Sequence, residues 1–529
     1  MDAGIAKYDL STITKFQEEL HGQYEGEDID DYRTDDNDEE TDDKHANKGL
    51  SRVRSIYAGR FHQTSWHTQL TSQLICKSTE NPFVYSVNNT YHFLKYAYAT
   101  FQVPAMQLKE KYRGTYQISL PPYVGHNMII SGHVDVDNSK FGYFDSHILD
   151  IESQYRHGKN RDHYDMMVGN VELLTKWTER IPEYNIQVPL PFDCARDPSH
   201  AFPLMYTNTK STIDIHLNIR NKIVDLLRMR KLSERTIEVQ DTKIIDGKPT
   251  KVISTKIEKY WREIPCIPDY LEGINAHGTI KKPEVWARYA YLTDKEVEWW
   301  KKCNGKVEET MDTSNPQEPE KIKLIHREYY IDDYISIDAD NENSYGETAS
   351  VALDGKYPSK KIYFFAENIS ARRNRNYSNY TTNTEEQLKG WDPCLKYTLA
   401  FGETKRIENM DNIHSSNVEP LYHEEYCPRD IGYHVISFAN FANALDADLG
   451  MTMASVKAKF NVKLGNSDPM LKPVMSEESR YEEQDNIYQE EFQKKHNSPK
   501  FLLRVRMLVT RKISFEYNEK TGQYKFRVH

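Results

Sequence analysis

The amino-acid sequence predicts an all-β protein built from two β-sandwiches, with long loop insertions and a few short helices. Two observations lead to this prediction: many short segments alternate apolar and polar residues, and one pair of such segments occurs twice. The 529 residues also include 36 Tyr, 19 Phe and 7 Trp, and aromatic side chains favour strands and interfaces. A chain of this length accommodates two large all-β domains.

The repeated pair spans Tyr184–Arg220 and, further along the chain, Tyr433–Leu464. In the first copy, apolar residues recur at every second position: Tyr184, Ile186, Val188, Leu190 and Phe192, then Ile213, Ile215, Leu217 and Ile219. The two runs of the second copy begin 249 and 243 residues later, at Tyr433 and Val456. Alternation with a period of two buries one face of a strand. The nearly constant offset therefore predicts one β module used twice.

The N-terminal region differs from the rest of the chain. Residues 1–20 are predicted to form a short amphipathic helix. From Glu25 to Lys44 there are twelve acidic and two basic residues, nearly all of the formal net charge of −11. We expect this tract to be disordered in isolation. The remaining chain is close to neutral, so it carries no overall electrostatic footprint for nucleic acid.

The first β region contains several strand-like runs before a connector. Its predicted strands are 65–76, 89–105, 116–120, 127–137, 184–192 and 213–219, with helical periodicity at 146–155 and 170–177. The connector begins with residues 221–235, whose pattern indicates a basic helix. Residues 236–258 are predicted to form a hairpin that turns at Asp246–Gly247, since Asp-Gly suits a two-residue turn.

The second β region begins at residue 284. Its predicted strands are 284–292, 329–338, 360–368, 394–403, 433–440, 455–464, 501–509 and 513–528, with a helix at 293–303. Many strands, few helices and long polar loops are typical of β-sandwiches.

The segment GHVDVD is the first candidate for chemistry. It places His133, Asp135 and Asp137 at alternate positions, a spacing that a divalent metal could use. Val134 and Val136 lie between them, which is the pattern of a half-buried strand with a solvated outer face. The sequence favours that structural interpretation, so no metal site is predicted.

A second acidic segment resembles the start of a calcium-binding loop. Asp338, Asp340 and Glu342 fit its first ligand positions. However, the sixth position is Asn343 where such a loop needs Gly, and the twelfth is Ala349 where it needs Glu. The segment therefore does not predict a calcium site.

Two further candidates also favour structural roles. Cys194 follows Asp193, but no nearby His supports a nucleophile. A loop with three arginines and two tyrosines could contact phosphate, but acidic residues follow it, so a solvated loop is favoured: Arg372, Arg373, Arg375, Tyr377 and Tyr380. Together with the absence of common catalytic motifs, these observations predict no catalytic, cofactor-binding or metal-binding residues and no enzyme.

Six scattered cysteines without a CxxC pair suit a reducing compartment. The first residues lack the apolar core of a signal peptide, and no run of about twenty apolar residues predicts a membrane span. Four N-x-[ST] sequons occur, at Asn88, Asn368, Asn376 and Asn379. Without a secretory signal, we interpret them as chance matches in an Asn-rich chain.

Several of these segments, in order, resemble the double jelly-roll major capsid proteins of large nucleocytoplasmic DNA viruses. The first-region segments that carry the resemblance are AYATFQVPAM, MIISGHVDVDNSKFGYFDSHILD and VPLPFDCARDPSHAFPLMYTNTKSTIDIHLNI. The second-region segments are EVWARYAYLTDKEVEWWKKC, SKKIYFFAEN and GYHVISFANFANALDADLGMTMASVKAKFNVKL. The resemblance spans about residues 51–510, whereas the acidic tract and the connector match no known part of that family.

The resemblance implies two consecutive eight-stranded jelly-roll β-barrels. The domains would be an N-terminal helix and acidic tail at 1–50, a first jelly roll at 51–235, a connector at 236–283, and a second jelly roll at 284–529. It also implies a structural capsid protein that trimerises into pseudo-hexagonal capsomers and builds an icosahedral shell. Loops 372–388 and parts of 303–320 would project outward.

The implied partners are two further copies in a homotrimer, neighbouring capsomers, minor capsid proteins and internal membrane-associated proteins, with no direct nucleic-acid binding. The implied location is the virion shell, assembled in the host cytoplasm. One alternative is a double jelly-roll assembly scaffold or minor capsid paralogue. A more remote one is a carbohydrate-binding or enzymatic β-sandwich protein, because a fold alone does not determine function.

Overall fold

The computed structural model describes residues 68–157, 160–196, 200–245, 248–272, 280–294, 297, 306–312, 320–384, 387–438, 451–465 and 500–529. The predicted N-terminal helix, the acidic tract and most of the predicted helix at 293–303 lie outside these ranges. No helix within the described residues is long and apolar enough to cross a membrane.

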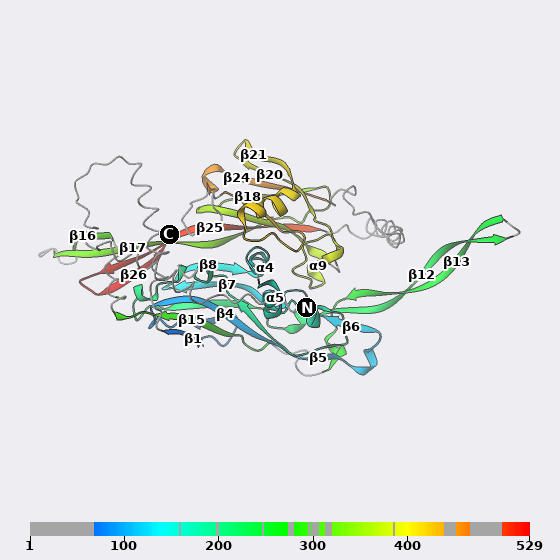
Figure 1. The fold of residues 1–529 in the computed structure, drawn as a ribbon, viewed down its shortest axis with the longest axis horizontal. Helices are drawn as coiled ribbons and strands as arrows, with labels where there is room; N and C mark the ends of the chain where they lie inside the picture. Colours follow the sequence, from blue (N-terminus) through cyan, green and yellow to red (C-terminus); the bar gives the residue numbers. More distant parts are fainter. Residues whose placement is uncertain are drawn as a thin grey trace, which may run out of the picture. The chain divides into compact units, whose positions relative to one another are not determined.

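The first jelly roll is formed by two antiparallel sheets (Figure 1). One sheet has the order β1 (Thr68–Gln73), β15 (Glu284–Tyr291), β4 (Phe93–Val103), β10 (Tyr184–Pro189). The other has the order β2 (Ile75–Cys76), β3 (Phe83–Ser86), β11 (Ile213–Ile219), β7 (Ile129–Val136), β8 (Ser139–Asp145). Both sheets contribute residues of alternating burial to one apolar cluster, so the core lies between them.

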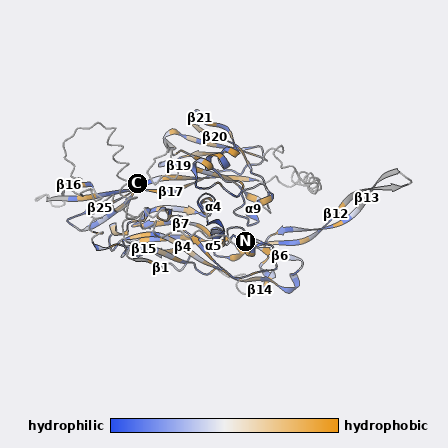
Figure 2. Ribbon diagram, in the orientation of Figure 1, coloured by the Kyte–Doolittle hydropathy of each residue, from blue (hydrophilic) through white to orange (hydrophobic). Residues whose placement is uncertain are grey.

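The second jelly roll repeats this arrangement. One sheet has the order β16 (Lys306–Asp312), β17 (Glu320–Asp338), β25 (Phe501–Asn518), β19 (Pro358–Asn368), β22 (His434–Ser437), with β23 (Met451–Thr452) beside β19 and β26 (Gln523–Val528) beside β25. The other has the order β18 (Thr348–Leu353), β24 (Ala458–Leu464), β20 (Cys394–Phe401), β21 (Thr404–Asp411). Figure 2 shows hydrophobic and hydrophilic residues alternating along the strands, the pattern from which the sandwiches were predicted.

The predicted duplication is confirmed by the sheet topology. In the first copy, β10 ends one sheet and β11 lies inside the other. In the second copy, β22 ends one sheet along the main path and β24 lies inside the other. The two strands of each repeated pair therefore belong to different sheets of one jelly roll.

The expected boundary between the two jelly rolls has to be corrected. Residues 284–291, expected to open the second roll, form β15, which pairs with β1 and β4 of the first. The first roll therefore closes only at β15, and the expected connector is an insertion before its last strand. Apolar alternation predicts that a segment is a strand, but it does not say which strands will be its neighbours.

The insertion is a long hairpin of β12 (Arg228–Ile245) and β13 (Lys248–Ile264). Ile245 faces Lys248 across it, and Asp246–Gly247, where the turn was predicted, lie outside the described residues. The predicted basic helix at 221–235 is wrong: it contains only a 3-10 turn at Ile223–Asp225 before β12 begins. Pairing with β13 on one side and β6 (Tyr116–Ser119) on the other overrides the local helix preference.

The α-helices among the described residues are short, and most lie in connections of the first roll. They are α3 (Val124–Met128), α4 (Ser146–Tyr155), α5 (Arg161–Val168), α6 (Glu172–Thr175), α7 (Asp193–Arg196), α9 (Ile369–Arg373) and α10 (Glu419–His423). A small sheet joins β14 (Leu271–Glu272), β5 (Met106–Leu108) and β9 (Arg180–Ile181). Helix α4 matches its predicted range, and Asp145 caps it by accepting a hydrogen bond from the Ile148 amide at 2.9 Å.

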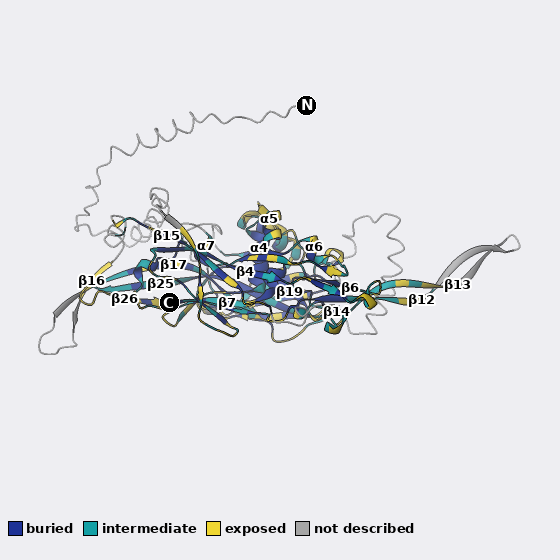
Figure 3. Cartoon of the chain, turned by 90° about the horizontal axis from the view of Figure 1, so that it is seen from below, coloured by how far each residue is buried: buried dark blue, intermediate teal, exposed yellow. Residues whose placement is uncertain are grey.

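One sheet of the second roll is buried on both faces. Every residue of β19 after Pro358 is buried (Figure 3). Ile362 and Phe364 belong to the core of the second roll, whereas Tyr363 and Phe365 belong to the apolar cluster of the first. The two rolls therefore pack on each other through this sheet, and side chains from both rolls fill the junction.

The middle of the loop expected to project outward at 372–388 is instead buried. Asn376, Ser378, Asn379, Tyr380 and Thr381 are each at most 2% exposed. In the other loop, at 303–320, residues 306–312 form β16 and 313–319 lie outside the described residues. The polar composition of the first loop reflects internal hydrogen bonding, such as Tyr380 to Asp150, and not contact with solvent.

The hairpin insertion can be shortened without touching the first roll. Beyond Lys231, β12 pairs only with β13 within the described residues, and Leu232 faces Trp261 across the hairpin. Replacing residues 233–260 by Asn-Gly should therefore leave the melting temperature nearly unchanged in differential scanning fluorimetry. A large fall relative to the full-length protein would mean that the hairpin contributes to the stability of the roll.

Candidate functional site

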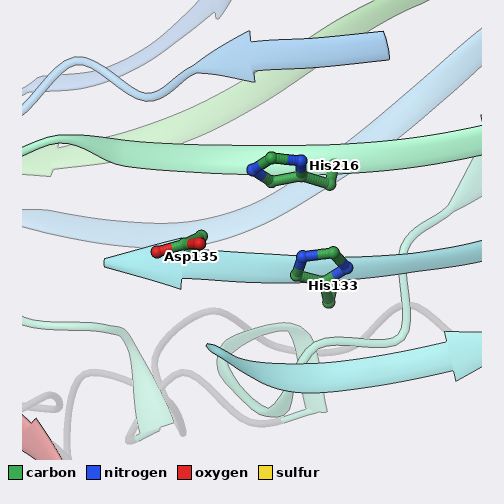
Figure 4. A group of neighbouring side chains, drawn as sticks. All are labelled: His133, Asp135 and His216. Carbon is green, nitrogen blue, oxygen red and sulfur yellow. The ribbon is translucent and has the colours of Figure 1, made fainter. Parts of the chain in front are cut away.

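The structure separates the three residues of the GHVDVD segment. His133 and Asp135 share a face of β7, but Asp137 lies in the following turn with φ of 49° and accepts a hydrogen bond from the Thr212 amide at 2.9 Å. The register brings His216 of β11 directly opposite His133. Figure 4 shows His133, Asp135 and His216 together on the two neighbouring strands. Spacing within one strand could not reveal this third residue.

The two imidazole rings of this group are stacked. Their centroids lie 4.6 Å apart with planes 8° from parallel. Burial, followed by His216 and Lys140, lowers the pKa of His133 to about 4, so its ring is neutral at pH 7. Neutral imidazole is the form that binds metals.

A second group with metal-ligand chemistry lies in the second roll. Asp392, Cys394 and His434 also bring donor atoms within 4.8 Å of one another. Here, however, the groups already bond to protein partners: His434 contacts Asp392 at 3.2 Å and Ser415 at 3.0 Å, and Asp392 accepts from Asn412 at 2.8 Å. These contacts are those of a satisfied structural network.

The remaining residues singled out by sequence do not converge on a site. Asp338 bonds to two arginines, whereas Asp340 is exposed. Cys194 is buried, and burial raises the pKa of its thiol to about 12, which opposes nucleophilic reactivity.

Two arginines of the loop that could contact phosphate instead bond to other groups of the protein. Arg372 bonds to Glu367 at 2.6 Å, and Arg375 donates to the Leu227 carbonyl at 2.7 Å. Three of the four sequon asparagines are at most 2% exposed, namely Asn368, Asn376 and Asn379. Asn88 is exposed.

The most extensive polar cluster lies between the two jelly rolls. Arg196 of α7 donates to Glu152 of α4 at 3.1 Å and to Asp332 of β17 at 3.0 Å. Lys360 of β19 bonds to Asp332 at 2.7 Å. All four side chains are at most 13% exposed. The first roll and the second roll are therefore joined by buried, paired charges.

A second ion cluster follows the same pattern. Arg506 of β25 bonds to Asp145, the cap of α4, at 2.9 Å and to Asp338 at 2.8 Å. It is 2% exposed. Its guanidinium therefore connects the start of α4 in the first roll to two strands of the second.

Helix α4 makes further polar contacts across the junction. Tyr380 donates to Asp150 at 2.7 Å, and its hydroxyl lies 2.9 Å from Nδ1 of His147. Nδ1 of His126 lies 2.7 Å from the same Asp150. Burial, with Arg506 and Arg504, holds the pKa of His147 well below its usual value, so this imidazole is neutral at pH 7. Nine of the ten residues of α4 are buried, which makes it the central element of the junction.

The cations determine the protonation of the junction carboxylates. Burial by itself would raise the pKa of Asp332, but Lys360 and then Arg196 outweigh it and hold the pKa below the usual range. For Glu152, burial is likewise outweighed by Arg156 and Arg196. Both carboxylates are therefore ionised at neutral pH. The cluster holds two surfaces together and leaves no group poised for proton transfer among these residues.

Removing Arg196 should strongly destabilise the protein. Arg196→Ala would leave Glu152 and Asp332 buried with fewer compensating charges, and breaking such a pair costs about 3–5 kcal/mol. The free energy of unfolding measured in urea should fall by that order. The matched control is Lys176→Ala, whose partner Glu172 is 80% exposed. That exposed pair should contribute less than about 1 kcal/mol, and equal losses in the two variants would contradict the assignment.

Acid should weaken the same junction. A carboxyl group with a folded pKa below its unfolded value of about 4 stabilises the protein fully above that pH, and the stabilisation is lost as pH falls toward the folded pKa. Asp332→Asn should therefore lower the urea midpoint at pH 7 and do so by a smaller amount at pH 3, where part of the stabilisation is already lost. Asp162→Asn, at an exposed site, is the control. An Asp332→Asn deficit that stays the same at both pH values would contradict the pKa assignment.

Known proteins with similar sequences share one description. The chain is 21% identical over 417 residues to the major capsid protein of Tipula iridescent virus, covering 74% of this chain and 78% of that protein. It is 22% identical over 455 residues to the major capsid protein of Lymphocystis disease virus 1, covering 81% and 86%. No family model matches the chain.

Solved structures show the same fold. The Faustovirus major capsid protein aligns with a TM-score of 0.54 at 9% identity, covering 88% of this chain and 98% of that one. The VP54 protein of PBCV-1 aligns with a TM-score of 0.55 at 10% identity, covering 87% and 96%. Over most of its length the chain is therefore similar in sequence to major capsid proteins of iridescent viruses and of Lymphocystis disease virus 1, and it shares the fold of capsid proteins with two jelly rolls in one chain.

Proposed function

We propose that this protein is a structural subunit of a viral capsid, in which three copies form a pseudo-hexagonal capsomer and capsomers build an icosahedral shell. The observation that carries the proposal is the junction of the two jelly rolls within one chain. It combines an apolar surface with buried ion pairs, so the two rolls behave as one rigid block. Three such blocks supply six similar rolls, which is the number that a hexagonal tile needs.

The fold suits crowding in a lattice. Jelly rolls bring most strand edges into packed sheets, so adjacent copies avoid edge-to-edge aggregation. The edge strand β21 is mostly exposed and carries four charged residues among eight, TKRIENMD. Charge on an edge strand opposes unwanted strand pairing. A shell subunit must contact its neighbours through defined interfaces and not through unpaired sheet edges.

The proposed role is structural and not enzymatic, and its place is the virion shell, assembled in the host cytoplasm. The proposed partners are two further copies, neighbouring capsomers, minor capsid proteins and internal membrane-associated proteins. Direct nucleic-acid binding is not part of the proposal, since the chain outside Glu25–Lys44 is close to electrically neutral.

One segment carries apolar side chains that a permanent neighbour would cover. Between β21 and β22, the exposed apolar residues are Ile413, Val418, Leu421, Tyr422 and Ile431. Leu421 and Tyr422 are 69% and 75% exposed. Large aromatic and aliphatic residues are enriched in permanent interfaces. This segment is therefore our candidate for a contact between copies in the trimer.

The purified protein should be a trimer of about three times 62.1 kDa. Sedimentation velocity at micromolar concentration measures this directly. Leu421→Glu should shift the protein toward monomer because it places a charge in the proposed contact. Leu388→Glu, at a residue 92% exposed, should leave the trimer intact. A wild-type monomer would contradict the trimer, and a Leu421→Glu trimer as stable as wild type would contradict the contact.

The protein content of purified virus particles distinguishes a shell subunit from a transient assembly scaffold of the same fold. A shell subunit should dominate the protein content of purified particles. A scaffold should be depleted from them after maturation.

A further inference from the structure

The outer face of the first jelly roll holds a group of three side chains that the capsid role does not use. His133 and Asp135 come from β7, and His216 comes from the neighbouring strand β11 (Figure 4). We propose that these three residues bind one zinc ion. The proposal is independent of the capsid function, and it departs from the sequence prediction because His216 enters the group only through strand pairing.

The backbone places all three ligands on one face. His133 and His216 are directly paired, and Asp135 lies two residues beyond His133, so the period of the strand brings it to the same side. The ligand atoms of the three residues all lie within 4.8 Å of one another. Strand β7 is paired with β11 on one side and β8 on the other. The positions of the three Cα atoms are therefore held by the interior of a sheet.

The donor atoms of this group lack protein partners. Nε2 of His133 is buried and accepts or donates no hydrogen bond to any described residue. The side chains of Asp135 and His216 likewise form no hydrogen bond or ion pair within the described part of the chain. A buried polar atom without a partner is rare in proteins and calls for a ligand. The group Asp392, Cys394 and His434 differs here, because Asp392 and His434 bond to each other and also to Asn412 and Ser415.

The ligand types select the metal. Two imidazole nitrogens and one carboxylate oxygen are a set that zinc accepts with three protein ligands and one water. Calcium and magnesium prefer oxygen ligands throughout, so two histidines argue against them. Zinc bonds of about 2.1 Å require the ligand atoms to lie closer together than 4.8 Å. Side-chain rotations that splay the stacked rings would bring the nitrogens and the carboxylate around the ion without moving the strands.

The neighbouring charges leave the Asp135 carboxylate available. Lys140 faces Asp135 across β7 and β8 and is exposed. Lys77 is bonded to Asp214 at 2.7 Å, so that cation is already engaged by another carboxylate. Zinc in this position would tie β7 to β11 at the middle of their sheet.

The test uses the full-length protein after chelator treatment and dialysis. Zinc chloride is titrated, and bound zinc is measured by equilibrium dialysis with elemental mass spectrometry. The wild type should bind one zinc per chain more than His216→Ala, and Asp135→Asn should bind that zinc more weakly. His163→Ala, which removes an exposed histidine outside the group, should retain the zinc of the wild type.

Cobalt(II) gives a second readout that does not depend on counting ions. Wild type loaded with one cobalt should show the intense visible absorption of a four-coordinate site, and His133→Ala should lose it while keeping its far-ultraviolet circular dichroism. Equal zinc binding by wild type and His216→Ala would overturn the proposal. So would a cobalt spectrum of octahedral type in the wild type, because this indicates adventitious surface binding.

Discussion

The sheet that faces both cores is the constraint on which the rest of the structure depends. Strand β19 is buried over its whole length after Pro358, with Phe364 in the core of the second roll and Phe365 in the cluster of the first. Along β19 the sheet has no solvated face, so ordinary amphipathic alternation does not apply to this strand. The first roll therefore packs on the outer face of a sheet of the second roll, and neither roll can be displaced without exposing aromatic side chains.

Charges within this junction decide how the rolls are aligned. Arg506, Arg196 and Lys360 each meet a carboxylate at between 2.7 and 3.1 Å in a nearly dry environment. Apolar contacts are tolerant of small shifts, whereas buried ions become costly as soon as they lose their partners. Hydrophobic burial thus supplies most of the attraction, and the ion pairs specify one relative position. In the proposed shell, where every subunit has to adopt the same structure, a single alignment would be a functional requirement.

The hairpin insertion and the proposed zinc ligands both lie away from this junction. The β12–β13 hairpin is inserted before the last strand of the first roll and, beyond Lys231, pairs only with itself within the described residues. The His133, Asp135 and His216 group lies on the outer face of the same roll. Insertions and sites at such positions can change without disturbing the packing between the rolls. The packing between the two rolls is therefore constrained, whereas the hairpin and the outer face of the first roll can vary.

Sequence alone determined the features that depend on local periodicity. It predicted the strands of both modules and the range of α4, because alternation and helical spacing are properties of neighbouring residues. It also predicted two jelly rolls. The order of the strands in the sheets and the similarity to solved double jelly-roll structures confirm this prediction.

Only the tertiary structure decided the features that depend on pairing over long distances. The insertion of β15 between β1 and β4, the strand conformation of 228–235 and the burial of Tyr380 all follow from partners far away in the chain. His216 meets His133 for the same reason, since the register of two strands places them opposite each other. A strand pattern specifies which face is apolar, but the identity of the neighbouring strand is decided by packing of the whole chain.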